Sequence, residues 1–331
     1  MQTRLAFHDT PLILEVICPE HLSLPRLKGL LHDYWWDRYS GSQPTRLHLE
    51  IFDGSSPLPE EFQASTETLA LAEGIRFTFS LTRVAIQLGH TSALVDFSKS
   101  SATVYMDSEF RHHTSSQLST FWLAILVSLL QSQRTYMMHA AGLTSANGEG
   151  VIFVATGGSG KSTLTLGLIG GGWPFLSDDI LFLRESDSSI HAYAGRRSFY
   201  VLSERADHYR DWPFGESNSP DREGNLRQEI LVHQRYPSQF RAHCHPTVLI
   251  LPRIIREPHS RLIPLERATA IKDLLRESSI GLTGRRILPG QLAVLTRLVG
   301  QCRVFRLESG EDLHRCPANF SELLEQAKST L

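Results

Sequence analysis

A glycine-rich loop in the middle of the chain contains the residue types that bind phosphate. Residues 155–162 read Ala-Thr-Gly-Gly-Ser-Gly-Lys-Ser, which departs from the pattern Gly-x4-Gly-Lys-Ser/Thr only at Ala155. Backbone N–H groups of such a loop surround an anion, and the helix that follows points its positive end at it. Lys161 can reach the β and γ phosphates of a nucleotide, and the Ser162 hydroxyl can bind Mg²⁺. The residues expected to contact the nucleotide are Thr156, Gly157, Gly158, Ser159, Gly160, Lys161, Ser162 and Thr163.

An acidic pair, Asp178 and Asp179, interrupts an apolar run at 173–183. Unpaired carboxylates in a buried strand are costly, so the pair must end the strand, be satisfied locally or face a cation. If the strand stays regular, the two side chains point to opposite faces, and only one faces the nucleotide. A strand-end turn without chemistry is one interpretation. A kinase would instead use one carboxylate near Mg²⁺ and one near the acceptor hydroxyl.

The pattern of strand-like and helical segments that must position these residues predicts two domains. Residues 1–112 contain strand-like segments at 11–17 and 46–52, a helical segment at 26–39, and four short strands between 75 and 108 that indicate an antiparallel meander. They form an N-terminal α+β module of unknown role in this interpretation. Residues 113–331 form the second domain, in which strand, glycine-rich loop, helix and strand follow one another between 151 and 183 as in a βαβ unit. Its other predicted elements are a helix at 116–133, strands at 136–145, 246–254 and 302–309, helices at 266–278 and 290–301, and a long surface loop at 213–227.

Composition is that of an ordinary soluble protein, with 41% hydrophobic and 21% charged residues and a formal net charge of −2. This balance predicts no bulk attraction to nucleic acid or to an anionic membrane. The most apolar segment, 121–130, is about half as long as a membrane span, so a buried core helix is the better interpretation. The four cysteines have no C-x-x-C spacing and the start of the chain has no signal-like pattern; we expect reduced thiols and a cytoplasmic location.

The stretch from His139 to Asp179 resembles the HPr kinase/phosphorylase family. In that family a histidine lies about 21 residues before the loop lysine; here His139 precedes Lys161 by 22 residues, and the acidic pair follows it by 17 and 18. The resemblance is specific over about 45 residues, looser over the rest of the second domain and absent from the first. It implies an α/β fold with a P-loop domain of the kind found in the C-terminal domain of HPr kinase and in PEP carboxykinase.

The resemblance also implies roles for single residues. Asp179 would accept the proton of a substrate serine, Lys161 would hold the transferred phosphate, and His139 would belong to the catalytic pocket. The implied metal ligands are Ser162, Asp178 and Glu204. The sequence around Glu204, Val-Leu-Ser-Glu-Arg-Ala-Asp, differs from the Glu-Ile-Arg-Gly of the family.

Two other segments have residues that could bind a ligand. The guanidinium groups of 195–197, Gly-Arg-Arg, suit phosphate geometry, although a solvated turn is an equal alternative. In the segment His-Cys-His at 243–245 the two histidines share one face, and without a second ligand cluster a structural role is favoured over metal binding.

Three functions stay open. The first is an ATP- and Mg²⁺-dependent kinase that phosphorylates a serine-type hydroxyl on a protein or peptide. The second is a nucleotide-binding regulatory or interaction protein with slow hydrolysis or none, and the third is a P-loop enzyme with a small-molecule acceptor. We take the kinase as the prediction. Its partners would be a nucleotide, a protein or peptide phosphoacceptor and, as the resemblance implies, further copies of the chain, with no nucleic acid and no membrane.

Overall fold

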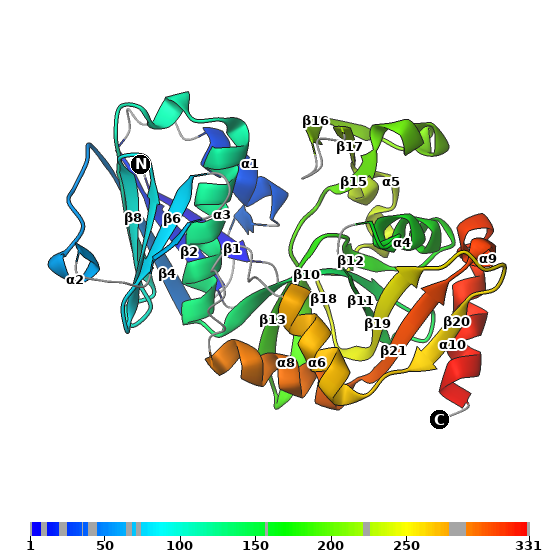
Figure 1. The fold of residues 1–331 in the computed structure, drawn as a ribbon. Helices are drawn as coiled ribbons and strands as arrows, with labels where there is room; N and C mark the ends of the chain where they lie inside the picture. The colour runs from blue at the N-terminus through cyan, green and yellow to red at the C-terminus, as the bar shows by residue number, and fades with distance from the viewer. Residues whose placement is uncertain are drawn as a thin grey trace. The chain divides into compact units, whose positions relative to one another are not determined.

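The computed structural model of the chain describes residues 2–7, 12–19, 25–34, 36–38, 45–63, 68–70, 74–155, 158–220, 226–277 and 289–329. The described chain forms two compact units; the first ends at Tyr136 and the second begins at Met137. Each unit has a large sheet with helices, so the predicted mixed α/β character is confirmed (Figure 1). None of the described helices combines the length and the apolar character needed to cross a membrane.

The first unit contains a mixed sheet in the order β3-β1-β2-β4-β9-β8-β7-β6-β5. Its strands are β1 Gln2–Phe7, β2 Leu12–Ile17, β3 Trp36–Arg38, β4 Thr45–Asp53, β5 Thr68–Ala70, β6 Ile75–Phe79, β7 Arg83–Leu88, β8 Thr91–Asp96 and β9 Ser101–Met106. Strands β6 to β9 pair antiparallel in sequence order, which confirms the predicted meander. The predicted helix at 26–39 extends too far at its C-terminal end. Helix α1 is Pro25–Asp33, and residues 36–38 instead pair with β1, as suits an aromatic segment beside a free sheet edge.

Helix α3, Ser115–Ser132, belongs to the first unit because it packs against β7, β8 and β9. Its side chains at Phe121, Ile125 and Leu129 are fully buried, as expected for the apolar segment 121–130. A capping box between Thr114 and Gln117 starts the helix. The predicted domain boundary after residue 112 differs from the end of the first unit at Tyr136, because α3 packs against the sheet of this unit. Two short helices, η1 Phe110–His112 and α2 Glu60–Gln63, complete its helical elements among the described residues.

The second unit contains a mixed sheet in the order β18-β14-β13-β10-β11-β19-β21-β20, with β12 also pairing with β10. Its strands are β10 Thr135–Thr144, β11 Gly150–Val154, β12 Phe175–Ser177, β13 Ile180–Ser186, β14 Ser189–Ala194, β18 His243–Cys244, β19 Pro246–Ile254, β20 Arg261–Pro264 and β21 Arg303–Ser309. Strands β11, β19 and β21 are parallel neighbours. Strand β10 is antiparallel to both β11 and β12, so β11 and β12 run in the same direction with β10 between them. The strand–helix–strand unit predicted at 151–183 is therefore present, with a third strand inserted.

The core of the second unit lies between this sheet and the helices that cover it. Phe153, Ile250 and Phe305, from β11, β19 and β21, are buried in one cluster with Leu166 of α4 and Phe320 of α10. Helix α8 packs against β13, β14 and β19. The helices of this unit are α4 Lys161–Gly170, α5 Val232–Arg235, α6 Arg267–Glu277, α8 Pro289–Gln301, α9 Glu311–Arg315 and α10 Asn319–Ser329, with 3-10 helices η2 Ser203–Tyr209 and η3 Pro237–Gln239. Burial of a single aromatic side chain in such a core contributes about 1.5–3 kcal/mol.

A three-stranded sheet, β15-β17-β16, completes the second unit. It consists of β15 Phe199–Leu202, β16 Phe214–Pro220 and β17 Leu226–Ile230. The prediction of a long surface loop at 213–227 is therefore wrong for most of its length, because the backbone of β16 pairs with β17 despite a composition rich in Gly, Ser and Pro. Residues 221–225 of that prediction lie outside the described residues.

Candidate functional site

Several strand ends meet at one edge of the sheet in the second unit. Ala140 of β10 pairs with Val154, the last residue of β11, so His139 lies beside the start of the glycine-rich loop. On the other side of β10, the backbone N–H of Ala140 donates to the carbonyl of Asp179 at 3.1 Å. The register thus brings His139, the loop and the acidic pair together, at the carboxyl ends of β11 and β12 where α/β sheets bind ligands.

The glycine-rich loop has the backbone geometry that its glycines permit. Gly158 and Gly160 adopt φ of 81° and 84°, in the left-handed region that side chains disfavour, and Gly160 is the N-cap of α4. The Ser159 hydroxyl is buried and has no hydrogen-bond partner within the described residues. A buried hydroxyl without a partner is costly, and a polar ligand in the loop would satisfy it. Thr156 and Gly157, both predicted to contact the nucleotide, lie outside the described residues.

Lys161, the first residue of α4, is buried with a relative exposure of 6%. Its ammonium group donates to the backbone carbonyl of Asp178 at 2.9 Å. The lysine therefore spans from the start of the helix to the end of β12. The next residues, Ser162 and Thr163, are half-buried in the first turn of α4.

The two aspartates diverge, but not as a regular strand would direct them. The chain leaves the strand conformation at Asp178 and Asp179, between β12 and β13, so the pair lies at the end of a strand, one of the alternatives that the sequence leaves open. The Asp178 carboxylate is buried and accepts a hydrogen bond from the Thr165 hydroxyl of α4 at 3.0 Å. The Asp179 carboxylate instead faces His139.

Asp179 has two cationic or potentially cationic neighbours, one on each oxygen. Nε2 of His139 lies 2.9 Å from Oδ1, and a guanidinium nitrogen of Arg196 lies 3.6 Å from Oδ2. Burial alone would raise the pKa of this carboxyl, but the hydrogen bond and charge of His139, with the charges of Lys161 and Arg196, hold its pKa well below the ordinary value. About a third of the Asp179 side chain is exposed, so solvent reaches this pair.

Arg196 is held by main-chain and aromatic contacts. The Ser177 hydroxyl at the end of β12 donates to the Arg196 carbonyl at 2.9 Å, and the Arg196 N–H donates back to Ser177 Oγ at 3.1 Å. The guanidinium carbon lies 4.6 Å from the centre of the Tyr200 ring, and a guanidinium N–H donates to the Tyr200 hydroxyl at 3.4 Å. The absence of a side chain at Gly195 lets the backbone before Arg196 pass close to β13, since a Cβ there would lie 2.3 Å from the Ile180 carbonyl oxygen.

Sequence reasoning identified Arg196 only as one of two arginines in a segment that could equally be a solvated turn. It missed Thr165, Ser177 and Tyr200. The threonine occupies an ordinary helix position, and the other two act through the main chain or the face of a ring, for which the sequence has no pattern.

No contact among the described residues joins the predicted metal ligands Ser162, Asp178 and Glu204 into one group. Glu204 is exposed on η2, after the end of β15, while Asp178 is buried beside α4. Among the described residues there is no group of three or more His, Cys, Asp or Glu side chains arranged to hold a metal ion. The imidazoles of His243 and His245 both lie near that of His191, with ring centres 6.1 and 5.6 Å away.

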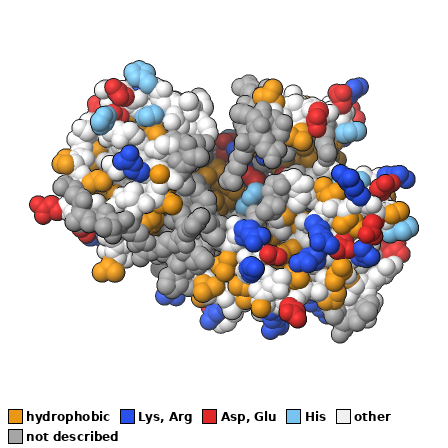
Figure 2. All heavy atoms as spheres, in the orientation of Figure 1, with side chains coloured by type: hydrophobic (Ala, Val, Ile, Leu, Met, Phe, Trp, Pro, Cys, Tyr) orange, Lys and Arg blue, Asp and Glu red, His pale blue; other side chains and the backbone are white. Residues whose placement is uncertain are grey.

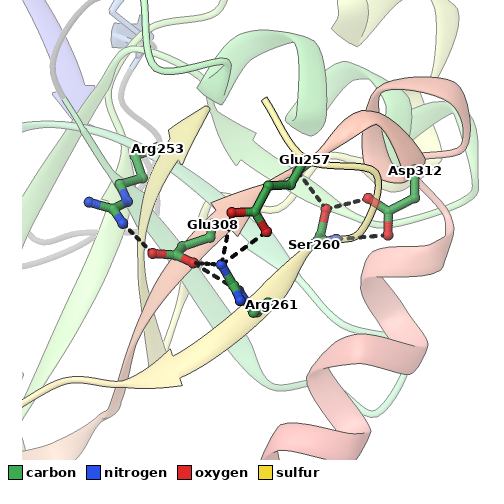
Figure 3. Close-up of polar contacts among 7 residues, drawn as sticks. Arg253, Glu257, Ser260, Arg261, Glu308 and Asp312 are labelled. Atoms are coloured by element: carbon green, nitrogen blue, oxygen red, sulfur yellow. Dashed lines mark hydrogen bonds and ion pairs between the residues drawn. The ribbon is translucent and has the colours of Figure 1, made fainter. Parts of the chain in front are cut away.

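A polar network joins β19, β21 and β20, which lie on the side of β11 away from β10 (Figure 3). The buried Glu308 of β21 is paired with Arg253 at the end of β19 and with Arg261 of β20, whose Nε donates at 2.9 Å. The hydrogen bond from Arg253 lowers the pKa of Glu308 below its ordinary value. Figure 2 shows basic and acidic side chains interspersed over this face of the second unit. Next to Arg253, Ile254 lies against the loop: its side chain would be 3.4 Å from a Cβ at Gly160.

Asp312 of α9 fixes the turn that follows β19. Its carboxylate accepts hydrogen bonds from both the hydroxyl and the backbone N–H of Ser260, the latter at 2.9 Å. The Ser260 hydroxyl in turn accepts from the N–H of Gly310 at 2.8 Å. These bonds join the residue that precedes β20 to the residue that follows β21.

Comparisons with known proteins leave the family of this chain open. No family model matches it, and no curated protein matches it. Among solved structures it is similar to the Hpr(Ser) kinase/phosphatase from Coxiella burnetii, with 13% sequence identity, a TM-score of 0.30, and coverage of 59% of this chain and 97% of the other. A likeness of this size establishes neither a common family nor a common activity.

Proposed function

We propose that the second unit is a P-loop domain and that the protein is an ATP- and Mg²⁺-dependent kinase, acting in the cytoplasm on a serine-type hydroxyl of a protein or peptide. The observation that carries this proposal is the position of Lys161. It follows two glycines with positive φ and reaches, buried, to the backbone of the acidic pair. A loop whose backbone suits phosphate binding thus lies beside a carboxylate that is partly open to solvent.

In this proposal the phosphates lie against the backbone of 158–161, with Lys161 on the β and γ groups. The buried Ser159 hydroxyl, which has no partner among the described residues, suits a phosphate oxygen. Ser162 and Asp178 would hold Mg²⁺, with Glu204 as the further ligand that the sequence analysis predicted. Mg²⁺ typically uses one or two carboxylates together with substrate phosphates, and it neutralises the charge that develops on them.

Asp179 is the proposed proton acceptor. In the transfer step the acceptor oxygen forms a bond to the γ phosphorus, the bond from that phosphorus to the bridging oxygen of ADP breaks, and the hydroxyl proton passes to Asp179. His139 occupies Oδ1 of Asp179, so the oxygen proposed to take the proton is Oδ2, which faces Arg196 in this structure. Catalysis would consist mainly of positioning and charge neutralisation.

One observation favours the alternative of a nucleotide-binding regulator. Both oxygens of Asp179 already face His139 or Arg196, and a carboxylate stabilised by such partners is a weak proton acceptor. If this arrangement persisted with nucleotide bound, transfer would be slow and binding would be the function.

The experiment incubates the protein with γ-labelled ATP, Mg²⁺ and the proteins and peptides encoded beside it. The kinase predicts acid-stable label on a serine of one partner, lost in Lys161→Ala and in Asp179→Asn while the latter still binds ATP. Asp187→Asn, in the exposed turn after β13, is the matched control and should transfer normally. Nucleotide binding without label on any partner would support the regulator, and full transfer by Lys161→Ala would remove the lysine from its assigned role.

A further inference from the structure

We propose that Arg196 is an exchanging arginine: it pairs with Asp179 when no nucleotide is bound and moves to the transferring phosphoryl group when one is. The proposal rests on the function proposed above and adds to it a residue that stabilises the transferred group. It also explains how Asp179, whose charge is balanced by Arg196 and His139 in the nucleotide-free protein, becomes a proton acceptor.

The contact between Arg196 and Asp179 is the looser of the two that the carboxylate makes. Its distance of 3.6 Å exceeds that of a charge-assisted hydrogen bond, about 2.7–2.9 Å, whereas His139 lies at 2.9 Å. The side chains of Asp179 and Arg196 are 34% and 26% exposed, so a ligand entering from solvent can reach both. The pair is therefore built to separate at Oδ2 while Oδ1 stays with His139.

Leaving Asp179 does not release Arg196 from the site. Its backbone is bonded in both directions to Ser177, and its guanidinium lies over the face of Tyr200. Gly195, the preceding residue, donates its N–H to the Ile180 carbonyl at 3.0 Å. Because Ser177 holds the Arg196 backbone and the Tyr200 ring holds its side chain, the guanidinium group can turn from one anion to another with little loss of conformational entropy.

Charge favours the exchange when a triphosphate is present. His139 and Arg196 face the two oxygens of Asp179, and the Lys161 ammonium lies at the neighbouring Asp178 carbonyl, so the positive groups are already gathered here. A γ-phosphoryl group offers several anionic oxygens in a geometry that a guanidinium fork matches. Once Arg196 moves to it, Asp179 Oδ2 is open to the acceptor hydroxyl.

In the transfer step Arg196 keeps its proton. The hydroxyl proton goes to Asp179 Oδ2, the oxygen–phosphorus bond to the acceptor forms, and the bond to the ADP oxygen breaks. The guanidinium neutralises charge on the equatorial oxygens of the phosphoryl group as it passes between the two.

The test uses the full chain and compares ADP with ADP plus aluminium fluoride, both with Mg²⁺, since the fluoride mimics the transferring group. Arg196→Ala should weaken binding of the aluminium fluoride complex on the order of 100-fold, as expected for a group that acts in the transition state. It should weaken binding of ADP by less than about fivefold, the range of an exposed ion pair. Added guanidinium ion should restore part of the lost affinity in Arg196→Ala, which a structural role would not predict.

Four further variants sharpen the result. Arg196→Lys keeps the charge without the fork and should bind the aluminium fluoride complex with intermediate affinity. Tyr200→Phe keeps the ring and should resemble wild type, whereas Tyr200→Leu should lose part of the effect. Arg315→Lys, in an exposed pair with Glu311 on α9, is the matched control and should bind both ligands normally.

The outcomes separate this proposal from the one on which it rests. Equal losses of affinity for ADP and for the aluminium fluoride complex in Arg196→Ala, or no loss, would overturn the role of Arg196 and leave the kinase standing. A selective, guanidinium-rescued loss without transfer to any partner would support Arg196 and count against the assigned acceptor. If wild type bound neither ligand, both proposals would be wrong.

Discussion

The substitution Thr165→Val tests whether a helix hydroxyl holds the buried carboxylate of Asp178. Thr165 is completely buried, and its hydroxyl lies 3.0 Å from Asp178 Oδ1 and 3.1 Å from the carbonyl of Ser162. The hydroxyl has one proton, so these two acceptors compete for it. Valine has nearly the same shape, so the change removes the donor with little effect on packing.

The size of the effect shows which acceptor wins. A hydrogen bond to a charged group contributes about 1.5–3 kcal/mol, so loss of the donor to Asp178 should lower the free energy of unfolding by about 2 kcal/mol. A threonine that bonds back to its own helix contributes almost nothing, because the carbonyl of Ser162 is available for other bonds. In a unit of this size, about 2 kcal/mol corresponds to a fall in Tm of roughly 4–8 °C.

Calorimetry of the full chain measures this effect. The transition of the second unit is identified with a core variant of that unit, Phe320→Leu, which should lower it as well. Thr165→Ser keeps the hydroxyl and serves as the matched control, which should lose much less than Thr165→Val. A Tm for Thr165→Val within about 1 °C of wild type would show that the hydroxyl belongs to the helix backbone and refute the anchoring of Asp178.

Three further predictions concern the same region. The pKa of Asp179 is lowered in the folded chain, so its ionised form stabilises the fold above the unfolded pKa of about 3.9. This stabilisation is lost as the pH falls toward the folded pKa. Urea unfolding should therefore show a difference in stability between wild type and Asp179→Asn at about pH 5, and this difference should shrink on acidification. Gly195→Ala should destabilise the fold by about 2 kcal/mol, because the added Cβ would meet the Ile180 carbonyl of β13. The control Gly300→Ala lies in open space on α8 and should stabilise the fold by about 0.5–1 kcal/mol in the same assay. Equal effects of the two substitutions would contradict the close approach at Gly195. Ser177→Ala should destabilise by about 1–3 kcal/mol by removing both bonds to the Arg196 backbone, and an unchanged urea midpoint would show that water replaces them.

The strands that alternate in polarity and the helices with clear apolar periodicity could be predicted from the sequence. Strand β4, helix α3 and strand β21 lie within two residues of their predicted ends, because local patterning determines them. Strand β16 could not be predicted, since its Gly, Ser and Pro residues favour a loop and only pairing with β17 makes it a strand. The break at Asp178 and Asp179 was one of several alternatives, because the apolar residues on both sides are also compatible with one regular strand.

The candidate site divides in the same way. The loop and the acidic pair have fixed spacing and could be found, and the place of His139 followed from the resemblance. The pairing of Asp179 with Arg196 could not, because the β13–β14 hairpin brings them together and the sequence does not show which of two adjacent arginines turns inward. The supporting contacts from Ser177 and Tyr200 depend on that same hairpin.

Calorimetric titration with a non-hydrolysable ATP analogue and Mg²⁺ tests the central claim most directly, namely that the loop around Gly158 to Lys161 holds the phosphates. The account predicts saturable binding of one equivalent by wild type and at least a tenfold loss of affinity, about 1.4 kcal/mol, in Lys161→Ala. Absence of binding by the folded wild type, or equal affinity in Lys161→Ala, would contradict it.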